Sequence, residues 1–414
     1  MSTSTVLSEA EADRLSDADL VARSAAQLRI PRAEPADSFV LHAPLELLAR
    51  AALLPRVRAE GRAAARSRIT DLANEFIATG PAVVNRPEPT GADFDSLDAA
   101  AADLVTAIDA GDLERADDAA TWLGQTARPS DLRRLLAGDV LGRLSAAAHA
   151  SILLYQLPRI SPRDEITGEL LRGLARELAR YPDWRLHWID RIRPTASRPA
   201  GANDIFDALA AARSLAPPAS TFIFPLMSDV DTSGIAESIL GDVVTGSGDV
   251  AGRGRAVLRS AAWSMLLEPP DHAAYGWSHC LTLPQAVLGI AAATPRPDIA
   301  LAVAATYVIG FRSGLAVEPL DATFTLADPH LDLSSAIEAG PDWAAAAVWH
   351  ASETATGEIV TELVTRASIH PDAHFAKYTL ACLDAAADDS RHRRLFLAAA
   401  ARLAGMWARS SSLG

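Results

Sequence analysis

Apolar residues recur about every three to four positions along most of this chain, for example in residues 254–268, 298–312 and 392–408. That spacing places the apolar side chains on one face of an α-helix. Hydrophobic residues make up 49% of the 414 residues, and alanine, which has the highest helix propensity, dominates among them. One short run, Thr221–Phe224, resembles a β-strand. The sequence therefore predicts a mainly α fold, a large multi-helix globular bundle with little or no sheet.

Length and local composition suggest how the chain is organised. A chain of 414 residues exceeds the usual size of a single hydrophobic core. We expect residues 1–37, which are polar and acidic, to form an N-terminal peripheral segment, and residues 38–410 to form the helical domain. Residues 194–256 are rich in Pro, Gly, Ser and Asp, and we expect them to be irregular, as a lid or a lobe boundary. An extended excursion is expected at residues 317–333.

The charge and the apolar runs argue against several partners. A net charge of −14 disfavours binding to nucleic acid or to anionic membranes, since both need basic patches. The N-terminus lacks the basic and apolar regions of a secretory signal, and the apolar run 299–310 is too short to span a membrane. Cys280 and Cys382 each lie in an apolar run, as small buried thiols in a reducing compartment do. These features predict a soluble cytoplasmic protein.

Lysine occurs once in this sequence. Of the 38 lysines and arginines, Lys377 is the only lysine, and the other 37 are arginines. Arginine stays protonated in proteins, whereas a buried lysine can lose its proton and then act as a nucleophile or accept a covalent modification. His374 lies three residues earlier, on the same face of a predicted helix. Lys377 is therefore either a functional residue or a lysine whose stem packs on the core while its amine reaches water.

Four of the ten histidines lie within apolar, helix-like runs, namely His42, His149, His279 and His374. Imidazole is the commonest metal ligand in proteins, and an apolar helix interior is an unusual place for it without a partner. By contrast, His392 lies among charged residues and is expected to face solvent. The four histidines are candidate metal ligands that would form a buried cluster, and hydrogen-bonded core histidines are the alternative interpretation.

Convergence of these histidines with Lys377 would constrain the state of the lysine. An ammonium group has no lone pair for a metal and is repelled by it, so the amine would be neutral or carboxylated by carbon dioxide to a carbamate. A carbamate is an anionic oxygen ligand. A mixed set of nitrogen and oxygen ligands suits iron(II) better than magnesium or calcium, and it leaves zinc open. Arginine could not take this role, which would account for the single lysine.

The stretches that carry these residues resemble the questin oxidase-like family. The resemblance rests on residues 39–44, 148–154, 278–282 and 372–377, and it spans about residues 38 to 405. It implies a mostly helical oxygenase that uses O2 to oxidise or open a ring of a polycyclic aromatic, anthraquinone-like polyketide metabolite. It also implies a non-haem Fe(II) ion held by His42, His149, His279, His374 and carboxylated Lys377. The chain departs from the family pattern at Leu41, where an asparagine is expected, and in residues 194–256.

Further residues belong to this hypothesis. His272 is a candidate for proton transfer beside the ligands, and His370 is a competitor for a ligand role. An apolar cavity near Trp277, Phe375 and Tyr378 would hold the small aromatic substrate. The family resemblance also raises a nicotinamide reductant, NADPH, which the residues themselves leave open.

Other catalytic signatures are missing from the sequence. No His-Glu-x-x-His motif occurs and no glutamate stands three residues before a histidine, which excludes the usual zincin and ferritin-like di-iron arrangements. Residues 246–251 match the loose dinucleotide-binding pattern but lack the βαβ context that this pattern needs. Two other functions stay open: a zinc-dependent hydrolase with the same ligands, and a non-enzymatic α-helical scaffold whose histidines are hydrogen-bonded in the core.

Overall fold

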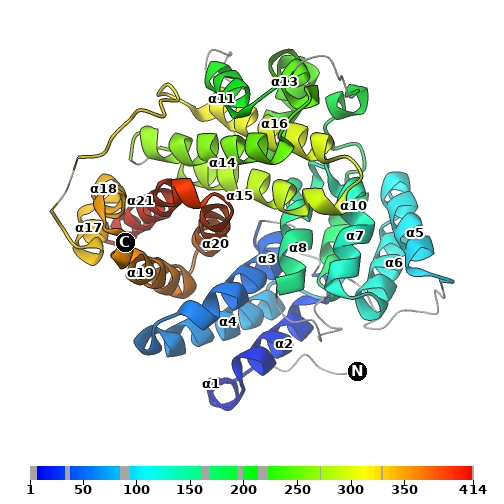
Figure 1. Ribbon diagram of the computed structural model, residues 1–414. Coiled ribbons are helices and arrows are strands. Elements are labelled where there is room, and N and C mark those ends of the chain that lie inside the picture. The colour runs from blue at the N-terminus through cyan, green and yellow to red at the C-terminus, as the bar shows by residue number, and fades with distance from the viewer. Residues whose placement is uncertain are drawn as a thin grey trace. The chain divides into compact units, whose positions relative to one another are not determined.

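Helices make up the regular structure of the protein (Figure 1). The computed structural model is 78% helical, with 20 α-helices and no strand among the residues that it describes. The described residues are 7–32, 38–83, 94–159, 168–193, 199–212, 222–270, 272–327 and 330–412. Extended pairing in these ranges is limited to isolated bridges such as that between Arg32 and Ala82. The prediction of a mainly α multi-helix fold is confirmed.

The chain divides into two compact units, of which the first contains residues 1–185 and 368–376. Its second segment, residues 368–376, is separated from the first by residues 186–367 of the second unit. The helices that lie wholly in the first unit are α1 (Glu9–Ala12), α2 (Asp17–Leu28), α3 (Ser38–Leu53), α4 (Ala59–Ala78), α5 (Leu97–Ala110), α6 (Leu113–Thr126), α7 (Pro129–Val140), α8 (Ala150–Gln156) and α10 (Leu171–Arg180).

Two groups of helices form the core of the first unit. Helices α2, α3 and α4 pack on one another, and α3 also contacts α8. Leu20, Leu48 and Leu72, one from each of these three helices, are fully buried. Helices α5, α6 and α10 form the second group, and α5 ends at Gly111, whose left-handed φ of 70° favours glycine at a helix C-terminus. Alanines buried on the three helices, such as Ala107, Ala120 and Ala175, allow these helices to approach closely.

The second unit contains residues 186–367 and 377–414. Helices α14, α15 and α16 pack side by side in it, and α17 and α18 pack against α21 (Figure 1). Its helices are α11 (Ala202–Ala211), α12 (Ile223–Thr232), α13 (Ile235–Thr245), α14 (Val250–Leu267), α15 (Ala274–Ile290), α16 (Pro297–Leu315), α17 (Leu333–Ala339), α18 (Pro341–His350), α19 (Thr356–Ile369), α20 (Ala373–Asp388) and α21 (Arg393–Ser412). The division between the units falls within α19 and α20, so both helices contribute residues to each unit.

Residues 199–212 and 222–256 carry helices, where their composition predicts irregular chain. Several glycines of this region lie at helix ends, because Gly201 and Gly234 precede α11 and α13, and Gly246 follows α13. Others are accommodated inside helices, as Gly241 is in α13. The β-like interpretation of Thr221–Phe224 is wrong for its described part, since α12 begins at Ile223. Pro225 falls in the first turn of α12, where proline costs no helical hydrogen bond. Residues 194–198 and 213–221 lie outside the described part of the chain.

Helix α16 is long and apolar enough to cross a membrane by length and composition. A helix that is apolar on all sides is either a membrane span or a core helix. In this protein 78% of its most apolar window is buried inside the fold, and Ala304, Val308 and Phe311 are each at most 1% exposed. The surroundings of α16 are therefore those of a core helix, packed against α14 and α15.

The crossing of α6 with the chain at Gly168 gives a first prediction. A Cβ added at Gly124 would lie 2.7 Å from the backbone of Gly168 and of Glu169, which cannot move aside as a side chain would. We expect Gly124→Ala to lower the free energy of unfolding by about 1–3 kcal/mol, the usual cost of overpacking. The matched control is Gly138→Ala in α7, where an added Cβ meets nothing within 4 Å. That variant should be stabilised by up to about 1 kcal/mol. Urea denaturation of both variants measures this, and equal effects would contradict the close crossing.

Candidate metal centre

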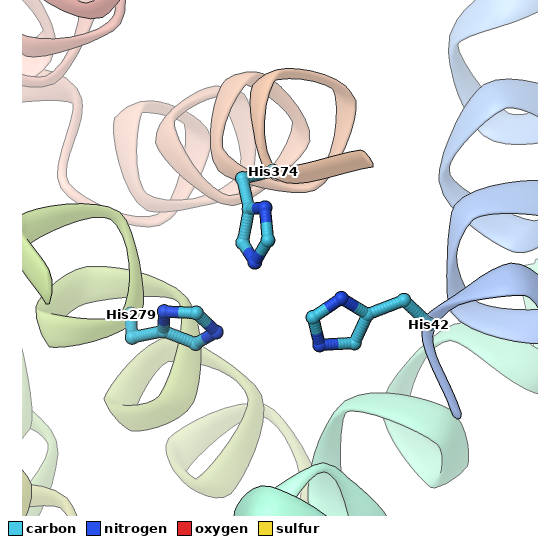
Figure 2. A group of neighbouring side chains, drawn as sticks. All are labelled: His42, His279 and His374. Carbon is cyan, nitrogen blue, oxygen red and sulfur yellow. The ribbon is translucent and has the colours of Figure 1, made fainter. Parts of the chain in front are cut away.

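Three histidines from distant parts of the sequence meet in the first unit. The ring of His42, on α3, has its centroid 4.6 Å from the ring of His149 and 4.8 Å from the ring of His374. The rings of His42 and His374 point toward each other from α3 and α20 (Figure 2), with ligand nitrogens within 4.8 Å. His42 is 7% exposed, and His149 is fully buried. We call these three residues the histidine cluster, and the ligand atoms of two of them, His42 and His374, lie close enough together to share a metal ion.

The hydrogen bonds of the rings fix which nitrogen carries the proton. Nδ1 of His374 lies 2.9 Å from a carboxylate oxygen of Asp372, and Nδ1 of His149 lies 3.0 Å from the carbonyl oxygen of Ala146. Both oxygens can only accept, so in each ring Nδ1 is the donor, and Nε2 keeps its lone pair. Metal-binding histidines usually have this arrangement, with Nδ1 held by a carboxylate or a backbone carbonyl and Nε2 toward the metal.

A strained turn positions His149. Ala146, Ala147 and Ala148 have φ values of 53°, 49° and 59°, which is the left-handed region that residues with a Cβ rarely adopt. This turn aims the carbonyl of Ala146 at Nδ1 of His149, and α8 begins directly after that histidine. Backbone strain of this kind persists only where the surrounding structure imposes it, and it concentrates at functional sites.

A buried arginine holds the segment that carries His374. Arg50 of α3 is 1% exposed, and it donates to the carbonyl oxygens of Ser368 at 2.7 Å and His370 at 2.6 Å. Its charge is balanced by Glu46, one turn earlier on α3, at 2.6 Å. Because α3 also carries His42, one helix supplies a histidine and anchors the end of α19, a few residues before α20 begins.

A cavity of about 370 Å³ lies beside the histidines within the first unit. His42 and His149 form part of its wall, so their rings face both the cluster and the cavity. Most of the remaining wall is apolar, and the charged residues in it come chiefly from α10. The apolar wall is contributed by Leu28, Leu41, Leu45, Phe76, Leu153, Leu170 and Leu174, among others.

The two other candidate ligands, His279 and Lys377, belong to the second unit. His279, which Figure 2 also draws, follows the same rule as His149, since its Nδ1 donates to the carbonyl of Tyr275 at 2.7 Å. Lys377 is 2% exposed and lies one helical turn after His374 on α20. The interpretation in which the amine of Lys377 reaches water is therefore wrong.

The cysteines of the second unit are structural. Cys280 and Cys382 are fully buried and unbridged, as predicted. Burial raises the pKa of the Cys280 thiol to about 12, so it is protonated at neutral pH. Burial also raises the pKa of the Tyr378 hydroxyl, and the nearby thiols of Cys382 and Cys280 add to this rise.

Two competing histidines have different surroundings. The backbone N–H of Asp372 donates to Nδ1 of His370 at 3.1 Å, so that nitrogen has no lone pair to offer and Nε2 carries the proton. His272 places Nε2 2.7 Å from the carbonyl of Leu315. His392 is predicted to face solvent, and its side chain is indeed 41% exposed and pairs with Asp389.

The aromatic residues expected around the substrate are not part of the wall of this cavity. Phe375 packs edge-on against His370 at 5.5 Å between centroids, and Trp277 and Tyr378 are buried in the second unit. The cavity of the first unit instead has Phe76, Tyr181 and Trp184 in its wall. Helical periodicity placed the three expected residues near the ligands in sequence, but it does not tell which face of a helix meets a cavity.

Sequence reasoning also missed the residues that support the histidines. Asp372 stands two positions before His374, and Glu46 and Arg50 are spaced one helical turn apart on the helix of His42. Charged residues inside such an apolar run are a signal that could have been noticed, because buried charges need a partner. The left-handed turn at residues 146–148 left no signal, since three alanines ordinarily favour a helix.

Comparison with known proteins adds no assignment of its own. No family model matches the chain, and no curated protein or solved structure matches it either. The questin oxidase-like resemblance therefore stays a prediction based on short motifs. Inferences about function rest on that resemblance and on the geometry of the histidine cluster.

The strained turn generates a second prediction. We expect Ala147→Gly to raise the free energy of unfolding by about 0.5–1 kcal/mol. The left-handed penalty of about 1–2 kcal/mol exceeds the entropic cost of glycine, which is roughly 0.5–1 kcal/mol. Ala102→Gly, at an exposed position inside α5, is the control and should lose about 1 kcal/mol. Urea denaturation compares the two, and a loss of similar size in both would mean that Ala147 is not strained.

Proposed function

We propose that this protein is a non-haem iron oxygenase of a small aromatic substrate. The observation that carries the proposal is that His149 and His374 both hold Nδ1 on an acceptor and leave Nε2 as the ligand, beside His42 and an apolar cavity. A scaffold with core histidines has no need for three imidazoles in contact, nor for a cavity that two of them line. The questin oxidase-like resemblance supplies the reaction class.

The residues present fit a metal ion on chemical grounds. Neutral imidazoles are ligands for iron and zinc, and the Asp372 carboxylate would orient His374 and increase the basicity of its Nε2. The proposed set is completed by His279 and by Lys377 as a carbamate, both as the family resemblance implies. Carbamate formation joins the neutral Lys377 amine to carbon dioxide and releases one proton. Lys377 is 2% exposed, so a carbamate on its amine would be sheltered from bulk water.

Iron(II), when bound, supplies the capacity to react with O2. The protein's own contribution is to hold the substrate and to exclude water. His42 and His149 lie in the cavity wall, so a ring bound in the cavity lies against the ligand set. The apolar lining favours a flat hydrophobic body, and it keeps bulk water away from a reactive intermediate. The resemblance also raises NADPH as the reductant that the reaction would use.

The metal prediction tests the cluster directly. His42→Ala, His149→Ala and His374→Ala should each lose most of the iron bound after anaerobic loading of protein without a histidine tag. Each of these variants lacks one proposed ligand. The control variant His392→Ala lacks only an exposed histidine and should retain all of the iron. Metal content per chain, measured with the circular dichroism of each variant, separates ligand loss from unfolding.

Three outcomes distinguish the alternatives. Full iron retention in two of the three variants, with native helicity, would return these histidines to a packing role in a scaffold. Binding of zinc alone, without consumption of O2 when aromatic substrates are offered, would favour the zinc-dependent hydrolase. Iron-dependent O2 consumption with an aromatic substrate is the result that the proposal expects.

Lys377 provides a separate prediction. Lys377→Arg should lose as much iron as Lys377→Ala, although arginine keeps the positive charge and much of the length. A guanidinium cannot form a carbamate, and its fixed charge would oppose the metal. Iron occupancy of the wild-type protein should rise with added bicarbonate, and acetate should partly restore iron to Lys377→Ala. Normal iron content in folded Lys377→Arg would show that the single lysine is not a ligand.

A further inference from the structure

We propose that the cavity of the first unit binds an aromatic compound through an anionic oxygen group, a carboxylate or a phenolate, that pairs with Arg32. This inference rests on the proposed function in one respect, because it describes the substrate of that enzyme. Its geometric basis is the cavity wall and the charges in it, which are independent of the metal. The relevant charged residues of the wall are Arg32, Arg176, Glu177 and Arg180.

Pairing inside the protein accounts for all but one of these charges. Arg176 donates to Glu114 at 2.9 Å and lies 3.8 Å from Asp117. Arg180 lies 3.4 Å from Glu177. Arg32 has no carboxylate partner among the described residues, and it remains as the unbalanced cation of the wall.

The surroundings of Arg32 leave hydrogen-bonding capacity unused. One terminal nitrogen donates to the carbonyl of Gly80 at 3.0 Å, and the buried Nε has no acceptor among the described residues. Burial lowers the pKa of this guanidinium, which means that its charge is incompletely solvated. An arginine remains charged even so, and a planar oxygen anion is the group that its donors match best.

The same wall favours an aromatic body next to that anion. Phe76 lies beneath the Arg32 guanidinium at 5.9 Å from the ring centroid, and Tyr181 stacks on Trp184 at 4.1 Å. All three rings belong to the cavity wall. Aromatic walls with one exposed cation are suited to flat, amphipathic molecules with an acidic group at one end.

Glu177 does not offset this preference. Burial raises the pKa of its carboxyl group, while Arg180 and Arg176 oppose that rise. Its charge is matched by Arg180 within the wall, so the residue neither neutralises Arg32 nor leaves a free anion to repel a ligand. The net character of the wall is apolar with one positive position.

Calorimetric titration of the metal-free, full-length protein tests this inference with three probes. They are 2-naphthoate, its neutral amide 2-naphthamide, and dodecanoate as an aliphatic acid.

We expect 2-naphthoate to bind more tightly than 2-naphthamide by roughly 10- to 100-fold, the range for hydrogen bonds to charged groups. Arg32→Gln should remove that preference without changing the affinity for 2-naphthamide. Arg32→Lys should keep part of it, and the exposed Arg14→Gln should keep all of it. Titration of the protein with a hydroxynaphthalene, at pH values above and below the pKa of its hydroxyl group, then distinguishes recognition of a phenolate from recognition of a carboxylate.

Each contrary result has a definite meaning. Equal binding of acid and amide, an acid preference that survives in Arg32→Gln, or no binding of either naphthalene would overturn the inference. Tighter binding of dodecanoate than of 2-naphthoate would overturn its aromatic part. Arg32→Gln should bind iron as the wild-type protein does, because Arg32 is not a ligand. Failure of the proposed oxygenase function would therefore appear in the iron content of the protein. Failure of the Arg32 proposal would appear in the affinities for the probes.

Discussion

A single buried guanidinium joins the two segments of the chain that carry His42 and His374. Arg50 joins α3 to the segment 368–370, more than 300 positions later in the sequence, through two short hydrogen bonds to carbonyl oxygens. Its partner Glu46 is 2% exposed and also pairs with Arg68 at 3.2 Å, and Arg68 pairs in turn with Glu75 at 2.8 Å. Two carboxylates thus match the two guanidinium groups. Breaking a buried pair by removing one partner typically costs about 3–5 kcal/mol, because an uncompensated charge remains. The anchor matters here because His42 and His374 lie on the two elements that it joins.

The second constraint is the protonation pattern of the rings. Asp372 and the carbonyl of Ala146 hold Nδ1 of His374 and His149, and this leaves both Nε2 atoms as ligands. His370 differs in this respect, because its Nδ1 accepts a backbone hydrogen bond. The strained turn at residues 146–148 is part of the same design, since it aims the carbonyl that holds His149. The fold thus orients the candidate ligands, which would lower the cost of binding an ion in the proposed site.

Helical periodicity and alanine content were sufficient to predict the fold class, because both are local properties of the sequence. The same reasoning singled out His42, His149 and His374, since a histidine in an apolar helix is conspicuous. It could not predict the anchor made by Arg50 or the cavity wall on α10, because both depend on long-range contacts. It also misjudged residues 199–256, where glycines that suggest a loop lie at helix ends, as Gly201 and Gly246 do, or inside a helix, as Gly241 does. The aromatic lining was misassigned for a similar reason, since spacing along a helix does not reveal its neighbour.

The central claim is that the histidines bind a metal through Nε2 while their Nδ1 protons stay on the protein. Long-range 1H–15N correlation spectra of histidine side chains, recorded as diamagnetic Zn²⁺ is titrated into the metal-free protein, measure this directly. The account predicts that His42, His149 and His374 shift together at one equivalent. It also predicts that Nε2 becomes the metallated nitrogen and Nδ1 stays protonated in His149 and His374, with His392 unchanged. Unaltered imidazole signals for these three residues at saturating Zn²⁺, or coordination through Nδ1, would contradict it.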